Sequence, residues 1–271
     1  MNFNSRIPVT AAMVMMLCCT TGCNRLKARD QLNKGVQAFK NARYEEAVGD
    51  FQRAIELDPS YEPAKLYLAA TYASQVVPNL DTPENLKIAN QALDQFHIVL
   101  SKDPNDLDAL RQVASIDRNI KKLDEAKEYE QKVIALAPND AEANYTIGVI
   151  DWMQEYKAAI TILAGDGLTD AGDGNPKKSK GACLKLQQAN TALVTEGLKF
   201  LNRAVEINPT YDDAMQYLNL TYRRKADLEC GDDAARKADL DQAQKWSDKA
   251  MGARKENELK KEKKNGGGVN M

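Results

Sequence analysis

Few residues in this chain have the types and spacing that catalysis or metal binding requires. The 271 residues include one histidine, His97, which alone cannot build a metal site of the usual ligand spacing. No GxSxG, HExxH or phosphate-loop pattern occurs. Asp166, Asp170 and Asp173 share one Gly-rich segment, but their spacing is not that of an EF-hand, and Asp beside Gly is ordinary turn chemistry. We therefore expect a non-enzymatic protein without cofactor or metal; a metal-dependent module using residues 164–181 is a remote alternative.

A pattern of small and aromatic residues recurs along the chain. From Tyr44 to Pro59, Ala47, Phe51 and Ala54 share one helical face, and the proline cannot continue the helix. Gly35 lies upstream at a position where a second helix would touch the first. Segments of the same kind end at Pro104, Pro138 and Pro209, and a last copy without a closing proline contains Ala243, Ser247 and Ala250.

This order and spacing resemble the tetratricopeptide repeat (TPR), a 34-residue helix–turn–helix whose small residues lie where two helices meet. The resemblance is specific because the offsets repeat. It implies an all-α fold: an α-solenoid of about five TPR units with extended hairpins in the fourth and fifth. The expected units are 28–61, 62–106, 107–140, 141–211 and 212–258, followed by a disordered tail at 259–271.

The extra length of the second, fourth and fifth units falls between their two helices. In a stack of parallel repeats that turn always faces the same edge, so the insertions should decorate one rim. A hidden sixth repeat within the fourth unit is rejected, because the apolar residues from Lys185 to Ile207 keep helical spacing and contain no turn signal. We therefore expect one long hairpin there.

Residues 1–22 are predicted to be a signal peptide. The apolar run from Ile7 to Leu17 is shorter than the ~18–20 residues that a membrane-spanning helix needs. Residues 20–23, TTGC, resemble a bacterial lipobox, although Thr20 stands where leucine is usual. The resemblance implies a lipidated Cys23, a short linker over 23–27, and, with Asn24 next, an outer-membrane lipoprotein whose repeats lie in the periplasm. An ordinary secretory signal or an uncleaved anchor remain alternatives.

Two of the five cysteines stay available if residues 1–22 are removed and Cys23 carries lipid. Cys183 and Cys230 both lie on the insertion rim of neighbouring units. An envelope compartment permits disulfides. We therefore favour a bridge between them, with two free thiols as the alternative.

The resemblance also assigns a groove, because the first helix of each TPR unit lines the concave face of the stack. Aromatic residues and arginine are the usual anchors of protein interfaces. The co-chaperone type of carboxylate clamp is not expected, since Leu32 and Val36 stand where it needs Lys and Asn. The alternative for Trp152 and Tyr145 is packing beneath the extended hairpin. The mapped positions are Leu32, Val36, Phe39, Lys40, Leu66, Arg111, Ser115, Arg118, Asn119, Tyr145, Val149, Trp152, Met153, Gln216, Leu220, Arg223 and Arg224.

The expected function is therefore a protein–protein interaction scaffold or adaptor held in the bacterial envelope by a lipid anchor, with a protein or peptide as partner. A structural subunit of an outer-membrane assembly or secretion complex is the alternative. The formal net charge of −2 gives no reason to expect nucleic-acid binding.

Overall fold

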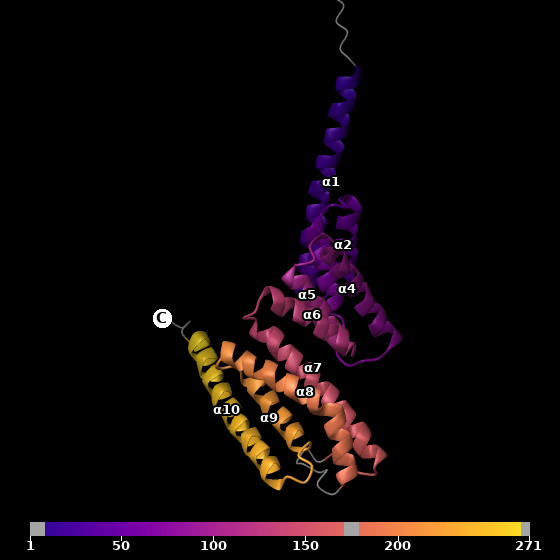
Figure 1. Cartoon of the computed structure of the whole chain (residues 1–271). Helices are drawn as coiled ribbons and strands as arrows, with labels where there is room; N and C mark the ends of the chain where they lie inside the picture. The colour runs from indigo at the N-terminus through magenta and orange to yellow at the C-terminus, as the bar shows by residue number, and fades with distance from the viewer. Residues whose placement is uncertain (1–8, 171–178, 267–271) are drawn as a thin grey trace, which may run out of the picture. The chain divides into compact units, whose positions relative to one another are not determined.

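The structure, a computed structural model, is all-α over the residues that it describes. These are the backbone of residues 9–170 and 179–266 and the side chains of residues 24–170 and 179–263. By contacts the chain divides into two compact units, Met1–Lys122 (unit 1) and Leu123–Met271 (unit 2), and each is described by itself. The helices follow one another in antiparallel pairs within each unit (Figure 1).

Unit 1 contains α1 (Val9–Lys40), α2 (Tyr44–Leu57), α3 (Glu62–Ala73), α4 (Pro83–Lys102) and α5 (Leu107–Asn119). Each helix packs on the next one in the chain. The residues that carry the repeat pattern form the contact: Ala47, Phe51 and Ala54 are fully buried. Gly35 of α1 lets the Phe51 ring approach so closely that an added Cβ would lie 2.5 Å from its Cε1 atom.

Unit 2 contains α6 (Leu123–Leu136), α7 (Ala141–Gly165), α8 (Lys180–Ile207), α9 (Asp212–Ala226) and α10 (Asp233–Gly266). The helices α7 and α8 form one long hairpin, and α8 is unbroken from Lys180 to Ile207, as the missing turn signal predicts. As between α1 and α2, a glycine lets the two helices of the hairpin approach closely. An added Cβ on Gly148 would lie 2.4 Å from Cγ of Leu201.

The starts of the repeated helices follow from local capping. The Asp106 and Asp140 side chains accept hydrogen bonds from the backbone N–H groups of Ala109 and Ala143, which α5 and α7 would otherwise leave unsatisfied in their first turns. Ser179 does the same for Ala182 at the start of α8. At the boundaries after Pro104 and Pro138, a proline that cannot continue one helix is thus followed by a polar cap that begins the next, whereas α3 and α9 begin after Tyr61 and Tyr211 without a side-chain cap.

Two predicted boundaries differ from the structure. Residues 24–27 belong to α1 rather than to a linker, because Asn24 to Lys27 contain no helix breaker. Residues 259–266 continue α10, where Glu and Lys side chains pair along the helix, as in the Lys260–Glu256 ion pair at 2.7 Å. Residues 267–271 of the expected tail lie outside the described residues, as do the side chains of the predicted signal peptide.

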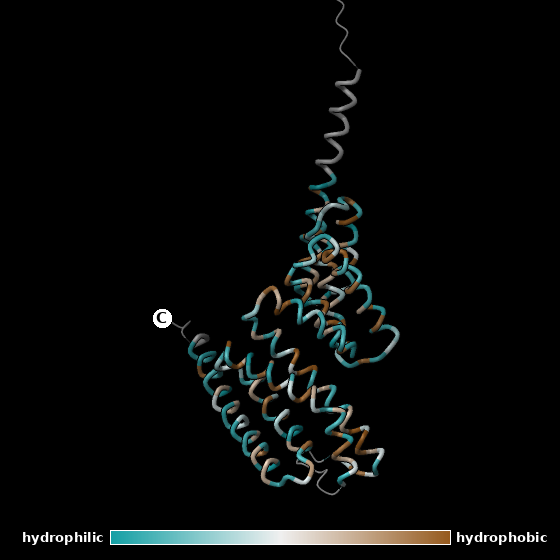
Figure 2. Tube along the Cα trace, viewed as in Figure 1, coloured by the Kyte–Doolittle hydropathy of each residue, from teal (hydrophilic) through white to brown (hydrophobic). Residues whose placement is uncertain are grey.

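The hydropathy of the described helices is mixed, with hydrophilic and hydrophobic residues alternating along each of them (Figure 2). Within the part of the chain that the structure describes, none of the helices combines the length and the apolar character needed to cross a bilayer. The apolar residues instead form stripes that pack helix against helix.

Gly35 and Gly49 form a matched pair for testing the close contact. We expect Gly35→Ala to destabilise the protein by about 1–3 kcal/mol, because the new Cβ would displace the buried Phe51 ring. Gly49→Ala should stabilise it by up to about 1 kcal/mol, because nothing lies within 4 Å of that position and alanine is the better helix former. Urea unfolding followed by circular dichroism measures both, and equal effects would contradict the packing assignment.

Candidate functional site

Unit 2 carries a connected row of aromatic rings on α7 and α9, which we call the aromatic stripe. It consists of Tyr145, Trp152 and Tyr156 on α7, and of Tyr211 and Tyr217 at the start of and within α9. Ring centroids are 4.9 Å apart for Tyr145 and Tyr211, 5.7 Å for Tyr145 and Tyr217, 5.5 Å for Trp152 and Tyr217, and 5.2 Å for Trp152 and Tyr156. These separations are in the range of favourable aromatic pairs.

Helical geometry explains why the stripe is continuous. Tyr145, Trp152 and Tyr156 recur at steps of seven and four residues, so they lie on one face of α7. Tyr217 of α9 makes edge contacts with both Tyr145 and Trp152, which joins the two first helices of neighbouring repeats. Tyr156 remains 40% exposed and the other four rings are half-buried, so this surface is accessible.

Trp152 and Tyr145 therefore pack against neighbouring rings and also keep part of their surface open. The Trp152 indole Nε1 is buried and has no hydrogen-bond partner among the described residues. The exposed part of this half-buried ring therefore consists of carbon atoms. The concave-face mapping missed Tyr156, Tyr211 and Tyr217. A helical step of four from Trp152 along the extended α7 would have found Tyr156.

The residues predicted to line the groove include buried, half-buried and exposed side chains. Leu32 and Arg224 are buried, at 8% and 6% exposed, which corrects the prediction that they line an open groove. Val149 belongs to the core as well. Lys40 and Leu66 are exposed, and the half-buried positions are Val36, Phe39, Arg111, Ser115, Arg118, Asn119, Tyr145, Trp152, Met153, Gln216, Leu220 and Arg223.

Arg224 is buried because two carboxylates neutralise it. Its guanidinium lies 3.0 Å from the Asp170 carboxylate and 3.2 Å from that of Asp227, and its central carbon lies 5.7 Å from the centre of the Tyr156 ring. A buried charge is tolerated only when it is paired in this way. Arg224 therefore closes one end of the aromatic stripe and does not present a free charge to a ligand.

The acidic residues of the α7–α8 loop also have basic partners. Asp166 lies 2.6 Å from Lys185, and Asp170 pairs with Arg224 as described. Asp173, the third acidic residue of the remote metal-site alternative, lies outside the described residues. The two described carboxylates thus bind the loop to α8 and α9.

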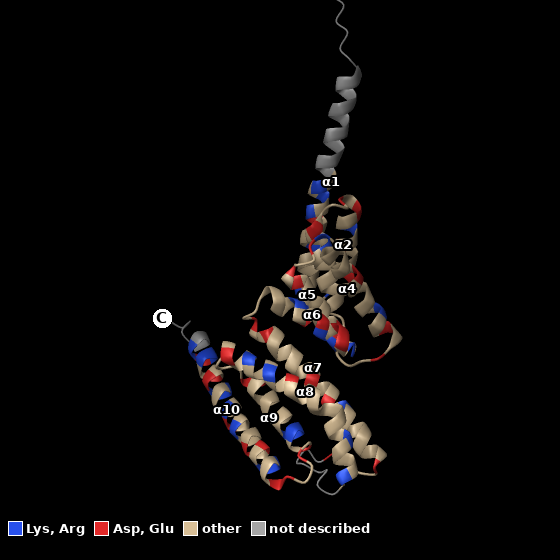
Figure 3. Ribbon diagram, viewed as in Figure 1, with Lys and Arg blue, Asp and Glu red and all other residues tan. Residues whose placement is uncertain are grey.

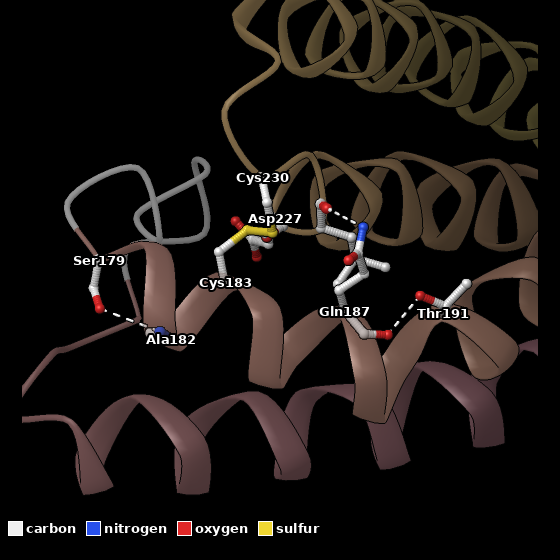
Figure 4. The surroundings of a disulfide bond; sticks show 8 residues. Ser179, Ala182, Cys183, Gln187, Thr191, Asp227 and Cys230 are labelled. Atoms are coloured by element: carbon white, nitrogen blue, oxygen red, sulfur yellow. Dashed lines mark hydrogen bonds between the residues drawn. A yellow bond between two sulfur atoms is a disulfide. The ribbon is translucent and has the colours of Figure 1, made fainter.

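A disulfide joins Cys183, in the first turn of α8, to Cys230, just beyond the end of α9 (Figure 4). Close by, the Gln187 side chain donates a hydrogen bond of 3.3 Å to the backbone oxygen of Leu228. The Ala159, Leu163, Ala182 and Leu186 side chains form an apolar cluster beside Leu228. The disulfide therefore joins the start of α8 covalently to the segment that follows α9.

Two carboxyl groups lie within the α7–α8 contact. Asp151 and Glu155 are fully buried, and an added Cβ on Gly197 of α8 would lie 3.3 Å from Asp151 Cβ and 3.6 Å from Glu155 Oε1. Lys127 of α6 donates to Asp151 at 2.6 Å and to Glu196 of α8 at 2.8 Å. Neither carboxyl oxygen of Glu155 has a hydrogen-bond partner among the described residues.

Burial is the largest influence on the pKa values of Asp151 and Glu155. It raises the pKa of Asp151 to about 6 against the opposing effect of Lys127, and it raises the pKa of Glu155 to about 9, helped by the nearby Asp151. Glu155 is therefore a neutral carboxylic acid at pH 7, which removes the cost of an unpaired buried charge.

Comparison with solved structures relates this geometry to known proteins. The MamA structure described as "MamA RS-1 ArsTM double mutant" is 18% identical over 85% of this chain and 96% of its own, with a TM-score of 0.57. MamA 41-end from Desulfovibrio magneticus RS-1 is 18% identical over the same shares, with a TM-score of 0.55. Another MamA crystal structure is 16% identical over 83% and 96%, with a TM-score of 0.54.

No family model matches the chain, and no curated protein matches it. At these identities the structural likeness shows the fold alone. Together with the repeated offsets of the small residues, it identifies the fold as the α-solenoid of TPR proteins.

The disulfide should stabilise the end of the solenoid. It closes a loop with a sequence separation of 47, for which the chain-entropy model gives about 4 kcal/mol. We expect reducing agent to lower the melting temperature of the wild type and to leave a Cys183→Ser/Cys230→Ser variant unchanged. Thiol counting on the denatured, unreduced protein provides the direct check, since two reactive thiols from Cys183 and Cys230 would disprove the bridge.

Glu155 should make stability fall as the pH rises. Its folded-state pKa of about 9 lies above the ordinary value of 4.5, so the folded state binds the extra proton between these limits. The free energy of unfolding should decline by about 1.4 kcal/mol per pH unit from this group across that window. Glu155→Gln should remove that slope and be more stable than wild type at pH 8.

Urea unfolding at pH 5, 7 and 9 measures this dependence. The control is Glu128→Gln, which replaces an exposed glutamate of α6 and should leave the slope unchanged. An identical pH profile for wild type and Glu155→Gln would show that Glu155 is already ionised at neutral pH.

Proposed function

We propose that this protein is a non-enzymatic interaction scaffold that binds a protein or peptide partner through the aromatic stripe of unit 2. The observation that carries the proposal is the row of linked, partly exposed rings from Tyr211 to Tyr156. The row lies on the first helices of two neighbouring repeats. This is the surface on which a TPR stack meets an extended segment.

The chemistry of the stripe fits a protein ligand. Tyrosine and tryptophan provide large contact areas at low cost in conformational entropy, and they dominate the energetics of many interfaces. The rings are fixed by their neighbours before binding, so little side-chain ordering is needed when a partner docks. Met153 and Leu220 are half-buried residues on the same two helices and add apolar surface.

The proposal includes anchoring in a bacterial envelope through lipid on Cys23. What supports it is the TTGC sequence and the short apolar run before it. The side chain of Cys23 lies outside the described residues. An outer-membrane location with the repeats in the periplasm follows from the same resemblance, through Asn24.

Photo-crosslinking in intact cells tests the stripe. With p-benzoylphenylalanine in place of Tyr156, 40% exposed on α7, we expect specific adducts with a partner, identified by mass spectrometry. The matched control replaces Leu184, 49% exposed on α8 and outside the stripe. Equal adducts at both positions would contradict the proposed surface. Adducts with several subunits of one membrane complex would favour a structural subunit.

Substitution of Cys23 tests the anchor. Cys23→Ala should abolish lipidation and move the protein from the membrane to the soluble fraction, provided the signal is still cleaved. Cell fractionation with N-terminal sequencing measures both events. If a cleaved Cys23→Ala protein stays with the membrane, lipid on Cys23 is not its only attachment.

A further inference from the structure

The start of the described part of α1 carries three cations close together in sequence. Arg25, Lys27 and Arg29 are exposed, and no ion pair joins them to a described carboxylate. Other exposed arginines of unit 1 differ, since Arg43 and Arg53 each pair at 2.7 Å with a glutamate three residues later. Figure 3 shows the basic residues on α1 where its described side chains begin.

The fold adds a second element to this cluster. Arg25, Leu26 and Arg29 line a cavity of about 450 Å³ together with Tyr61, which lies in the turn between α2 and α3. Arg25 and Arg29 are four residues apart and so share one face of α1. Leu26, at 70%, is among the most exposed large apolar side chains of the described chain. The cavity thus combines two guanidinium groups, a phenol and an exposed apolar side chain.

One acidic group, Asp58, lies close enough to the cavity to interact with Arg25. The Ser60 hydroxyl, which donates to Asp58 at 2.6 Å, is the main cause of the lowered pKa of Asp58, and Arg25 makes a smaller contribution. Asp58 already accepts hydrogen bonds from the Ser60 hydroxyl and backbone N–H. It therefore helps to place the turn that carries Tyr61, and its negative charge offsets part of the positive charge of Arg25.

We propose that this cavity, the basic collar of α1, binds the phosphate headgroup of an anionic phospholipid. Guanidinium groups bind phosphate through paired hydrogen bonds, and basic clusters beside a membrane anchor attract anionic lipid. Leu26 contacts the boundary between headgroups and acyl chains, and the Tyr61 hydroxyl supplies a further hydrogen bond. The inference rests on the proposed lipid anchor, which brings the collar to the membrane.

Distance supports a lipid as the occupant. At about 1.5 Å per residue along the helix, Arg25 and Arg29 lie about 3 Å and 9 Å from Cys23. The headgroup layer of one leaflet is about 5–8 Å thick. Lipid on Cys23 therefore places the Arg25 position within that layer and the Arg29 position just outside it.

Native mass spectrometry of the full protein, purified from membranes in detergent, tests the collar. Titration with phosphatidylglycerol should show at least tenfold tighter binding than titration with phosphatidylcholine. Arg25→Gln/Arg29→Gln should weaken phosphatidylglycerol binding about 30-fold, taking about 1 kcal/mol for each basic residue. The matched control, Lys245→Gln/Lys249→Gln, removes two exposed lysines of α10 with the same spacing and should change nothing.

The same spectra separate failure of the collar from failure of the anchor, because the covalent mass shows whether Cys23 carries lipid. Lipidated protein that binds both phospholipids equally, or whose binding survives Arg25→Gln/Arg29→Gln, would overturn the collar. Inorganic phosphate binding as tightly as phosphatidylglycerol would assign the cavity to free phosphate and also overturn it. Circular dichroism of the variants confirms that the fold is retained.

Discussion

The close approach of paired helices is the constraint on which the rest of the structure depends. Gly35 against Phe51 and Gly148 against Leu201 leave no room for a Cβ, and alanines such as Ala47 and Ala54 fill the remaining contacts. Because each such contact involves one helix and its neighbour in sequence, the fold is assembled from local pairs. This also explains why the insertions are tolerated: they lengthen a hairpin beyond the contact without disturbing it.

Lengthening a hairpin has a consequence for its interior. The α7–α8 contact extends far beyond a standard repeat, and part of it is polar, with Asp151 and Glu155 fully buried and Asn190 donating to the backbone oxygen of Glu155. Lys127 holds Asp151 and Glu196 together and so connects α6 to both helices of the hairpin. Glu155 is accommodated as a neutral acid, since burial and the nearby Asp151 outweigh the opposing effect of Arg224, and neither carboxyl oxygen has a hydrogen-bond partner among the described residues. The hairpin therefore depends on protonation as well as on apolar packing.

The sequence predicts the helices of this protein well and the exposure of its side chains less well. The long α8 and the segment Glu62–Ala73 follow from periodicity and proline positions, because both signals are local. Burial of Arg224 could not be predicted in this way, because it depends on Asp170 from a loop 54 residues away in sequence. Leu32 shows the same limit: a position that faces the groove in the average repeat lies in the core of unit 1 here. The helical end of α10 was missed because charged, Gly-flanked sequence is typical of disordered tails.

The disulfide, Arg224 and the aromatic stripe form one connected arrangement. Cys183 Sγ lies 3.5 Å from the backbone oxygen of Asp227, and the side chain of Asp227 pairs with Arg224. Arg224 in turn lies over Tyr156, the exposed end of the stripe. The disulfide therefore fixes the end of α9 at Asp227. Asp227 in turn holds Arg224 against the ring of Tyr156. The α7–α8 loop, through Asp170, and the segment after α9, through the disulfide, thus hold Arg224 in place beside Tyr156 at one end of the aromatic stripe.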